Sequence, residues 1–201
     1  SMSGKKGTAS YIPCGHTEES STNQLSVKTV VDKIKPLLCS KKIVGQHIKF
    51  DMNILSRFGI KLNNIENDTM LMSYIYNSTA TRHNLDALSN YYLNHKTITF
   101  EEIAGKGVKQ KTFNQIPIET ALTYASEDAD ITFRLHEELK KKLKKEPTLN
   151  SLLQEIELPL IPILSEMELA LANLNPQILE AQSKNLSRRI ETLTDKAFDL
   201  A

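Results

Sequence analysis

Short apolar runs with the period of strands alternate along the chain with longer segments in which apolar residues recur with the period of a helix. The chain opens on a strand–turn–strand pattern with Gly4 and Gly7 in the turn, so residues 1–12 predict a hairpin. The other expected elements follow in chain order: a helix over 27–38, a strand over 41–45, a helix from Gln46 to Gly59, a helix capped by Asp68 and a long helix from Thr120. This alternation predicts an α/β fold.

The pattern changes at Pro147, where a lysine-rich stretch at the end of the long helix stops. Beyond this proline the apolar positions have a helical period throughout, and no segment alternates like a strand. We therefore place a domain boundary here. Residues 1–146 are expected to form one domain, and residues 147–201 the all-helical beginning of another.

The segment TYASEDADITFRL places three carboxylates within four positions of the long helix. At about 100° per residue, Glu127 and Asp130 turn to the polar side, where solvent is expected to surround them. Asp128 instead lies within the apolar arc, together with Tyr124 one turn earlier. An unpaired carboxylate in that position costs several kcal/mol, so something in the interior must compensate Asp128.

Asp51 repeats this arrangement, because it shares the apolar stripe of the helix that begins near Gln46. Two inward carboxylates from different elements are compatible with burial if they share a divalent cation, and carboxylates with water are the ligands that Mg²⁺ and Mn²⁺ prefer. Two such ions can activate water against a phosphodiester, and the hydroxyl of Tyr124 could hold that water. In the alternative interpretation Asp128 is a structural acid paired with a backbone amide or an arginine, and Tyr124 is a core residue with a solvated hydroxyl.

Composition limits the classes of partner. Lys plus Arg number 25 against 24 Asp plus Glu, so a net charge of +1 gives no general electrostatic footprint for duplex DNA or an anionic membrane, and any nucleic-acid contact must be local. No apolar run approaches the roughly 18 residues of a membrane span. Cys14 and Cys39 lack the spacing of a zinc site or a disulfide framework. We therefore expect a cytoplasmic protein that does not bind membranes and is not an oligomer.

Six segments, in this order and at these spacings, resemble the 3′→5′ proofreading exonuclease domain of bacterial DNA polymerase I, a family A polymerase: GQHIKFD, DTMLMSYIYN, RHNLDALS, HKTITFEEIAGKG, TFNQI and YASEDADIT. The resemblance implies a ribonuclease H-like α/β fold, with a mixed sheet and flanking helices, followed after Pro147 by the opening helices of the polymerase domain. It also implies that Asp51 and Asp128 bind Mg²⁺ or Mn²⁺ in a two-metal site, and that Tyr124 positions the attacking water.

The resemblance further implies contacts with the single-stranded 3′ end of DNA, and makes the rest of the polymerase polypeptide a second partner. The matched positions are Gln46, His47, Phe50, Arg82 and Phe100. Phe100 could instead be a core residue, and Arg82 could form an ion pair with Asp86 at i to i+4. Three lysines of the following loop are as compatible with a solvated surface as with phosphate contacts: Lys106, Lys109 and Lys111.

One departure from the family pattern bears on activity. The family has two further metal-binding acids, an Asp-x-Glu pair on the first strand of the sheet, and the match places that strand before Ser1; residues 1–17 contain neither Asp nor Glu. We therefore expect the parent polymerase to remove mismatched 3′-terminal nucleotides, and residues 1–201 alone, without that strand, to be inactive. The alternative is a catalytically decayed exonuclease fold that serves as a DNA-binding or structural platform for the polymerase. Smaller departures are His47, where the family commonly has an amide, and Ala170 with Leu171, where it has a glycine-containing turn.

Overall fold

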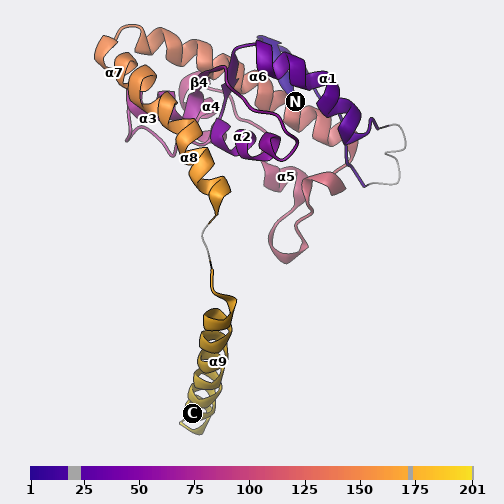
Figure 1. Ribbon diagram of the computed structural model, residues 1–201, viewed down its shortest axis with the longest axis vertical. Coiled ribbons are helices and arrows are strands. Elements are labelled where there is room, and N and C mark those ends of the chain that lie inside the picture. Colours follow the sequence, from indigo (N-terminus) through magenta and orange to yellow (C-terminus); the bar gives the residue numbers. More distant parts are fainter. Residues whose placement is uncertain (18–23, 172–173, 201) are drawn as a thin grey trace. The chain divides into compact units, whose positions relative to one another are not determined.

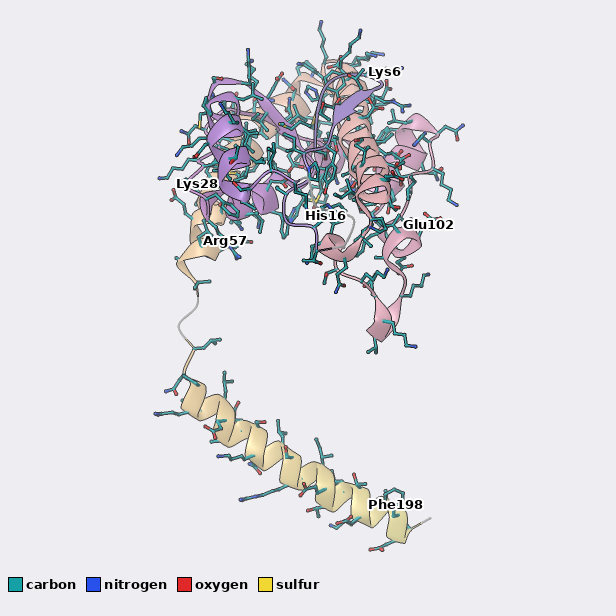
Figure 2. The ribbon with its side chains drawn as sticks, turned by 90° about the vertical axis from the view of Figure 1, so that its right-hand side faces the viewer. Lys6, His16, Lys28, Arg57, Glu102 and Phe198 are labelled. Carbon is teal, nitrogen blue, oxygen red and sulfur yellow. The ribbon has the colours of Figure 1, made fainter. Side chains whose placement is uncertain are left out.

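The computed structural model describes residues 1–17, 24–171 and 174–200 (Figure 1). The chain divides into two compact units, Ser1–Glu166 and Met167–Ala201. Within the described residues, the first unit carries the strands and every predicted site residue. The second contains the end of α8 (Leu158–Ala170) and all of α9 (Pro176–Asp199). Every residue of α9, including Phe198 in Figure 2, is exposed.

The strands form two pairs. β1 (Met2–Lys5) and β2 (Thr8–Ser10) pair antiparallel around a turn at Gly7, whose φ of 77° lies in the left-handed region, so the predicted hairpin is confirmed. β3 (Ile43–Gly45) pairs parallel with β4 (Ile65–Asp68). No ladder joins the two pairs within the described residues. Together with the helices around them, these strands give the expected ribonuclease H-like fold, with a helical segment after it.

The helices of the first unit mostly begin where a polar side chain accepts a hydrogen bond from the first turn, as at Ser26, Asp68, Asn84 and Thr99. Their bounds are α1 Val27–Ser40, α2 Ile48–Ser56, α3 Thr69–Tyr76, α4 Leu85–Leu93, α5 Phe100–Ala104, α6 Ile118–Leu143 and α7 Pro147–Leu152, with one π-helical segment, η3, over Leu153–Glu157. Short 3₁₀ turns at Gly107–Lys109 and Phe113–Gln115 connect α5 to α6.

Helix α6 is the central element of this unit. Its buried residues belong to three separate apolar clusters: Ala121 packs with α5, Ile131 and Leu135 pack with α4, and Leu139 and Leu143 pack with α3 and η3. The same helix contacts β1, β2 and β3, so it touches both strand pairs. The acidic segment near its N-terminal end is therefore held in place from several sides.

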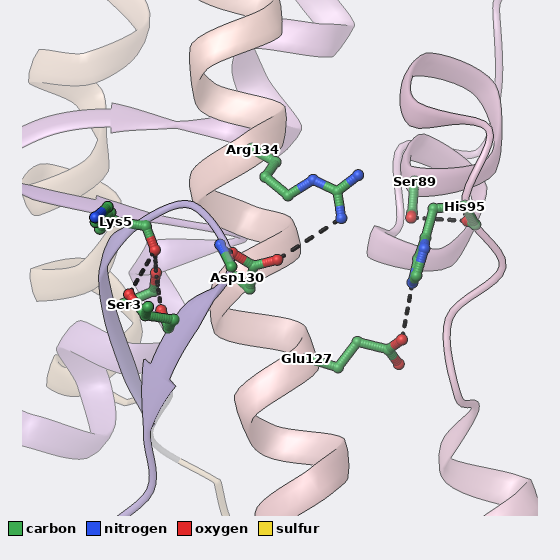
Figure 3. A network of polar contacts seen from close by, with 9 residues as sticks. Ser3, Lys5, Ser89, His95, Glu127, Asp130 and Arg134 are labelled. Carbon is green, nitrogen blue, oxygen red and sulfur yellow. Dashed lines mark hydrogen bonds and ion pairs between the residues drawn. The ribbon is translucent and has the colours of Figure 1, made fainter.

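The prediction of a solvated polar side on α6 is wrong for Glu127 and Asp130, whose side chains are only 19% and 18% exposed. Asp130 accepts a hydrogen bond from the backbone N–H of Gly7 and pairs with Arg134 at 3.7 Å (Figure 3). Glu127 bonds to the loop before α5. A helical period separates the faces of one helix but does not show which neighbouring segments cover each face.

The segment after Pro147 packs against the rest of the first unit. Leu153 and Ile161 are buried, and the Ser165 hydroxyl donates to Asn53 Oδ1 on α2 at 2.5 Å. The compact unit extends to Glu166, so the boundary at Pro147 remains a prediction about domain identity. The backbone of Leu171, at the position of the family's glycine-containing turn, has a φ of 62°, in the region that favours glycine. Among the described residues, no helix has the length and apolar character needed to cross a membrane.

Candidate active site

Asp51 lies in the first turn of α2, which follows β3 after two residues. A Cβ atom at Gly45 would stand 2.7 Å from the Ile48 Cβ, so only glycine lets the strand turn this tightly into the helix. His47 completes the turn with a left-handed backbone, at φ 58° and ψ 47°. The chain thereby places the N-terminal turn of α2 directly beyond the end of β3.

Asp68, at the end of β4, holds this turn from the neighbouring strand. Its Oδ2 accepts from the N–H of Ile48 at 2.6 Å, and its Oδ1 accepts from the N–H groups of Met70 and Leu71 at 2.8 and 3.2 Å. The predicted cap of α3 is confirmed, but the same carboxyl group also caps α2. Asp68 is 2% exposed, and its burial raises the pKa of the carboxyl group in spite of these hydrogen bonds.

Asp51 is solvent-exposed, so the prediction that it points into the interior is wrong. Its carboxyl group is nevertheless desolvated enough by the surrounding chain that its pKa is raised, and the negative charge of Asp68 raises that pKa further. Positive charge on the Ser1 amino group and on His47 acts in the opposite direction. The site therefore favours neutralisation of Asp51 by a proton or by a cation.

Tyr124 and Asp128 lie one turn apart on α6. Desolvation raises the pKa of Asp128 to about 6, the hydrogen bond from Tyr124 lowers it, and the charges of Asp86 and Glu127 raise it. Desolvation, followed by the charge of Asp128, raises the pKa of Tyr124 to about 12. Tyr124 is thus a neutral hydrogen-bond donor at neutral pH, and Asp128 is an acid that ionises within the physiological range.

Aromatic rings hold the ring of Tyr124. The Phe100 and Phe113 ring centroids lie 6.2 and 6.1 Å from the Tyr124 centroid, both in tilted geometry. Phe113 in turn contacts Tyr11 and the buried ring of His16, which Figure 2 labels. This packing leaves the hydroxyl of Tyr124 to interact with Asp128.

Asp51 and Asp128 both act on one point of the structure, the amino group of Ser1 at the beginning of β1. Burial lowers the pKa of this amino group, and the charges of Asp51, Cys14 and Asp128 raise it. Both acids therefore contribute negative charge that is felt at the start of the described chain.

The donor set fits a divalent cation in part. Among the described residues no three His, Cys, Asp or Glu side chains are grouped closely enough to hold a metal ion. Mg²⁺, however, commonly binds through one or two carboxylates and completes its shell with water and phosphate oxygens. Asp51 and Asp128, two carboxylates with raised pKa values, are the type of ligand that such an ion takes.

Three of the predicted DNA contacts, His47, Phe50 and Arg82, have accessible side chains. The ring of Phe50 is 60% exposed and stacks on His47, with a centroid distance of 6.5 Å and an interplanar angle of 21°. Arg82 is exposed as well. In the described part of the chain it does not pair with Asp86, which instead accepts a hydrogen bond from the Thr97 hydroxyl at 2.6 Å.

The side chains of Gln46 and Phe100 have partners inside the protein. Gln46 Nε2 donates to the carbonyl of His83 at 2.9 Å, and its Oε1 accepts from Thr69 at 2.5 Å. Phe100 is partly buried against Tyr124 at the start of α5. Both residues therefore shape the surroundings of the site, whether or not they also contact DNA.

Sequence reasoning missed Asp86 as a neighbour of the site. Its charge raises the pKa values of both Tyr124 and Asp128. The acid lies in the first turn of α4, two residues after the cap Asn84. Its i to i+4 spacing from Arg82 suggested a local ion pair, and no sequence signal connects α4 with the acidic segment of α6.

Comparison with known proteins identifies the family of this chain. A protein family described as 3'-5' exonuclease matches residues 2–144. DNA polymerase I of Pseudomonas aeruginosa is 46% identical over 201 residues, covering 98% of this chain and 22% of the relative, and that of Rhizobium leguminosarum is 33% identical, covering 98% and 20%. The chain thus spans about a fifth of the length of these relatives.

A solved structure shows the same fold at lower sequence similarity. It is described as the POL domain of Pol1 from M. smegmatis in complex with DNA primer-template and dNTP, and it matches with a TM-score of 0.53 and 23% identity over 73% of this chain and 22% of that one. Since the family match covers most of the chain and the curated relatives align over nearly all of it, this chain belongs to the 3'-5' exonuclease family of DNA polymerase I.

Proposed function

We propose that this chain is the exonuclease portion of a bacterial DNA polymerase I, and that in the longer protein it binds the single-stranded 3′ end of DNA and hydrolyses mismatched terminal nucleotides. The observation that supports the proposal is the desolvation of two acids at matched family positions, Asp51 and Asp128, with Tyr124 hydrogen-bonded to Asp128. A cation-dependent phosphodiesterase requires carboxylates that favour the binding of a cation, and desolvated carboxylates close to other negative charges have this property.

In this proposal Asp51 and Asp128 hold Mg²⁺ or Mn²⁺, which supplies Lewis acidity and lowers the pKa of bound water. The hydroxyl of Tyr124 orients the attacking water, because it remains protonated at neutral pH and its ring is fixed between Phe100 and Phe113. Stacking on an exposed aromatic ring is tolerant of base identity, so Phe50 suits a terminal nucleotide of any sequence.

A segment continuing upstream from Ser1 would enter the fold beside both acids, because the Ser1 amino group interacts with each of them. That is where the family's Asp-x-Glu strand is expected. Two carboxylates alone provide too little negative charge to hold two ions in register. We therefore propose that residues 1–201 by themselves bind the cation weakly and hydrolyse DNA little, while the remaining polymerase, in the bacterial cytoplasm, supplies the missing ligands.

A decayed exonuclease domain that acts as a platform for the polymerase is the second candidate. Retention of a desolvated Asp128 bonded to Tyr124 opposes it, since a platform gains nothing from the cost of this burial.

Hydrolysis of a 3′-labelled single strand by the full-length protein separates the two candidates. Wild type should release terminal nucleotides in Mg²⁺, and Asp51→Asn should lower the rate by more than about 100-fold, because losing a metal ligand exceeds the 10- to 100-fold effect of losing its outer partners. Asp32→Asn, at an exposed acid of α1, should match wild type and serve as control. A wild-type protein that extends primers but does not degrade them would support the platform instead.

A further inference from the structure

The loop between α4 and α5, residues 94–99, is fastened to α6 beside the candidate active site. Both oxygens of Glu127 are used: Oε1 accepts from His95 Nε2 at 2.8 Å, and Oε2 accepts from the backbone N–H of Ile98 at 2.7 Å. Figure 3 shows Glu127 reaching from α6 toward His95 on the loop. One carboxyl group thus fixes the loop at two points three residues apart.

Helix α4 holds the same loop from the other side. The Ser89 hydroxyl donates to the carbonyl of His95 at 2.8 Å (Figure 3). The buried Thr97 donates its hydroxyl hydrogen to Asp86 at 2.6 Å. Bonds from two helices at His95, Thr97 and Ile98 leave this loop little freedom, so its far end has a defined position.

The far end of the loop carries Phe100. Thr99 and Glu102 form a reciprocal capping box, which sets where α5 begins, and Phe100 is the first residue of that helix. Its ring lies 6.2 Å from the ring of Tyr124, which bonds to Asp128. Glu127, the residue just before Asp128, is therefore connected to Tyr124 through the loop and Phe100 as well as along α6.

We propose that Glu127 is a positioning residue for the exonuclease reaction: by bonding His95 and Ile98 it keeps Phe100 against Tyr124, so that the tyrosine hydroxyl stays aligned. This inference rests on the proposed function. Glu127 is not itself a metal ligand, because both of its oxygens already accept hydrogen bonds from the loop. Its effect should fall on turnover more than on DNA binding, because the exposed predicted DNA contacts Phe50 and Arg82 lie outside the loop that it holds.

The test measures kcat and KM for a 3′-labelled single strand, together with primer extension, in the full-length protein. Glu127→Ala should lower kcat by about 10- to 100-fold and leave KM within about threefold, because misplacement of roughly 1 Å has this consequence. Glu127→Gln keeps one carbonyl acceptor and should recover much of the loss. Glu138→Gln alters an acid of the same helix that pairs with Lys142 and should leave kcat unchanged.

The position of the loop is monitored separately with DNA that carries 2-aminopurine at its 3′ terminus, in the presence of Ca²⁺. Its fluorescence should change in Glu127→Ala, because Phe100 no longer holds its place, and should stay as in wild type in Glu138→Gln. If Glu127→Ala does not fold, His95→Ala removes one of the two bonds from the loop side and should give a smaller fall in kcat.

The outcomes are distinct. Wild-type kcat in both Glu127→Ala and His95→Ala overturns the inference while leaving the exonuclease assignment intact. Equal losses of exonuclease and primer extension also overturn it, because they indicate general destabilisation. A wild-type protein without exonuclease activity refutes the proposed function itself.

Discussion

Tyr124 stands one turn ahead of Asp128 on α6 and donates its hydroxyl hydrogen to the Asp128 carboxyl group. The hydrogen bond lowers the pKa of Asp128, but desolvation outweighs it and leaves the value at about 6. An ionised Asp128 therefore lowers the stability of the fold. A cation bound beside the carboxylate would offset this cost.

The first prediction is a pH-dependent stability difference between wild type and Asp128→Asn, without divalent metal. The folded pKa of about 6 exceeds the ordinary value of 3.8, so the stability that this group contributes is fully present below 3.8 and is lost as the pH rises through 6. At pH 7.5 the variant should therefore be more stable by about 1–2 kcal/mol, after allowance for partial exposure. Urea unfolding between pH 4 and 8 measures this, and a difference that does not shrink toward pH 4 would count against the raised pKa.

The second prediction concerns the tyrosine hydroxyl. Tyr124→Phe in the full-length protein should lower the rate of 3′→5′ hydrolysis by about 100-fold, while single-strand affinity stays within about twofold. The reason is that the ring keeps its contacts with Phe100 and Phe113 and only the hydroxyl is lost. Rapid-quench hydrolysis and fluorescence anisotropy report the two quantities. Equal losses in both would make Tyr124 mainly a binding residue.

The third prediction concerns the double cap at Asp68. Asp68→Ala removes the cap of α2 and the cap of α3 together, so it should lower the free energy of unfolding by about 2–4 kcal/mol, twice the effect of a single cap. Asn84→Ala, which removes only the cap of α4, should cost about 1 kcal/mol and serves as the matched comparison. Equal costs for the two variants would mean that the bond to Ile48 contributes nothing.

Much of the α6 half of the site could be predicted from the sequence, because Tyr124 and Asp128 are related by the period of a single helix. The strand β4 escaped prediction since its residues Ile65–Asp68 are mostly polar, and Asp68 reads equally well as a helix cap. The exposure of Asp51 could not be inferred either. A stripe identifies which residues share a face, but the packing of the neighbouring elements decides how much of that face is covered.

The anchoring roles of Glu127 and Asp130 depend on contacts between distant segments. Asp130 meets Gly7 across 123 positions of sequence, and Glu127 meets Ile98 across 29. No local pattern encodes such pairs, so helical periodicity assigned both acids to solvent. The resemblance to a known family implied the proposed catalytic positions but not these supporting contacts.

If Asp51 and Asp128 share one divalent cation, a double-mutant cycle on Mn²⁺ binding will show it. Binding to the full-length protein is measured by electron paramagnetic resonance for wild type, Asp51→Asn, Asp128→Asn and the double variant. If the ion is shared, each single substitution lowers the affinity, and the double variant loses clearly less than the sum of the two losses, because the site is already disrupted by either change. Strictly additive losses, or an affinity that neither substitution alters, would contradict a shared site.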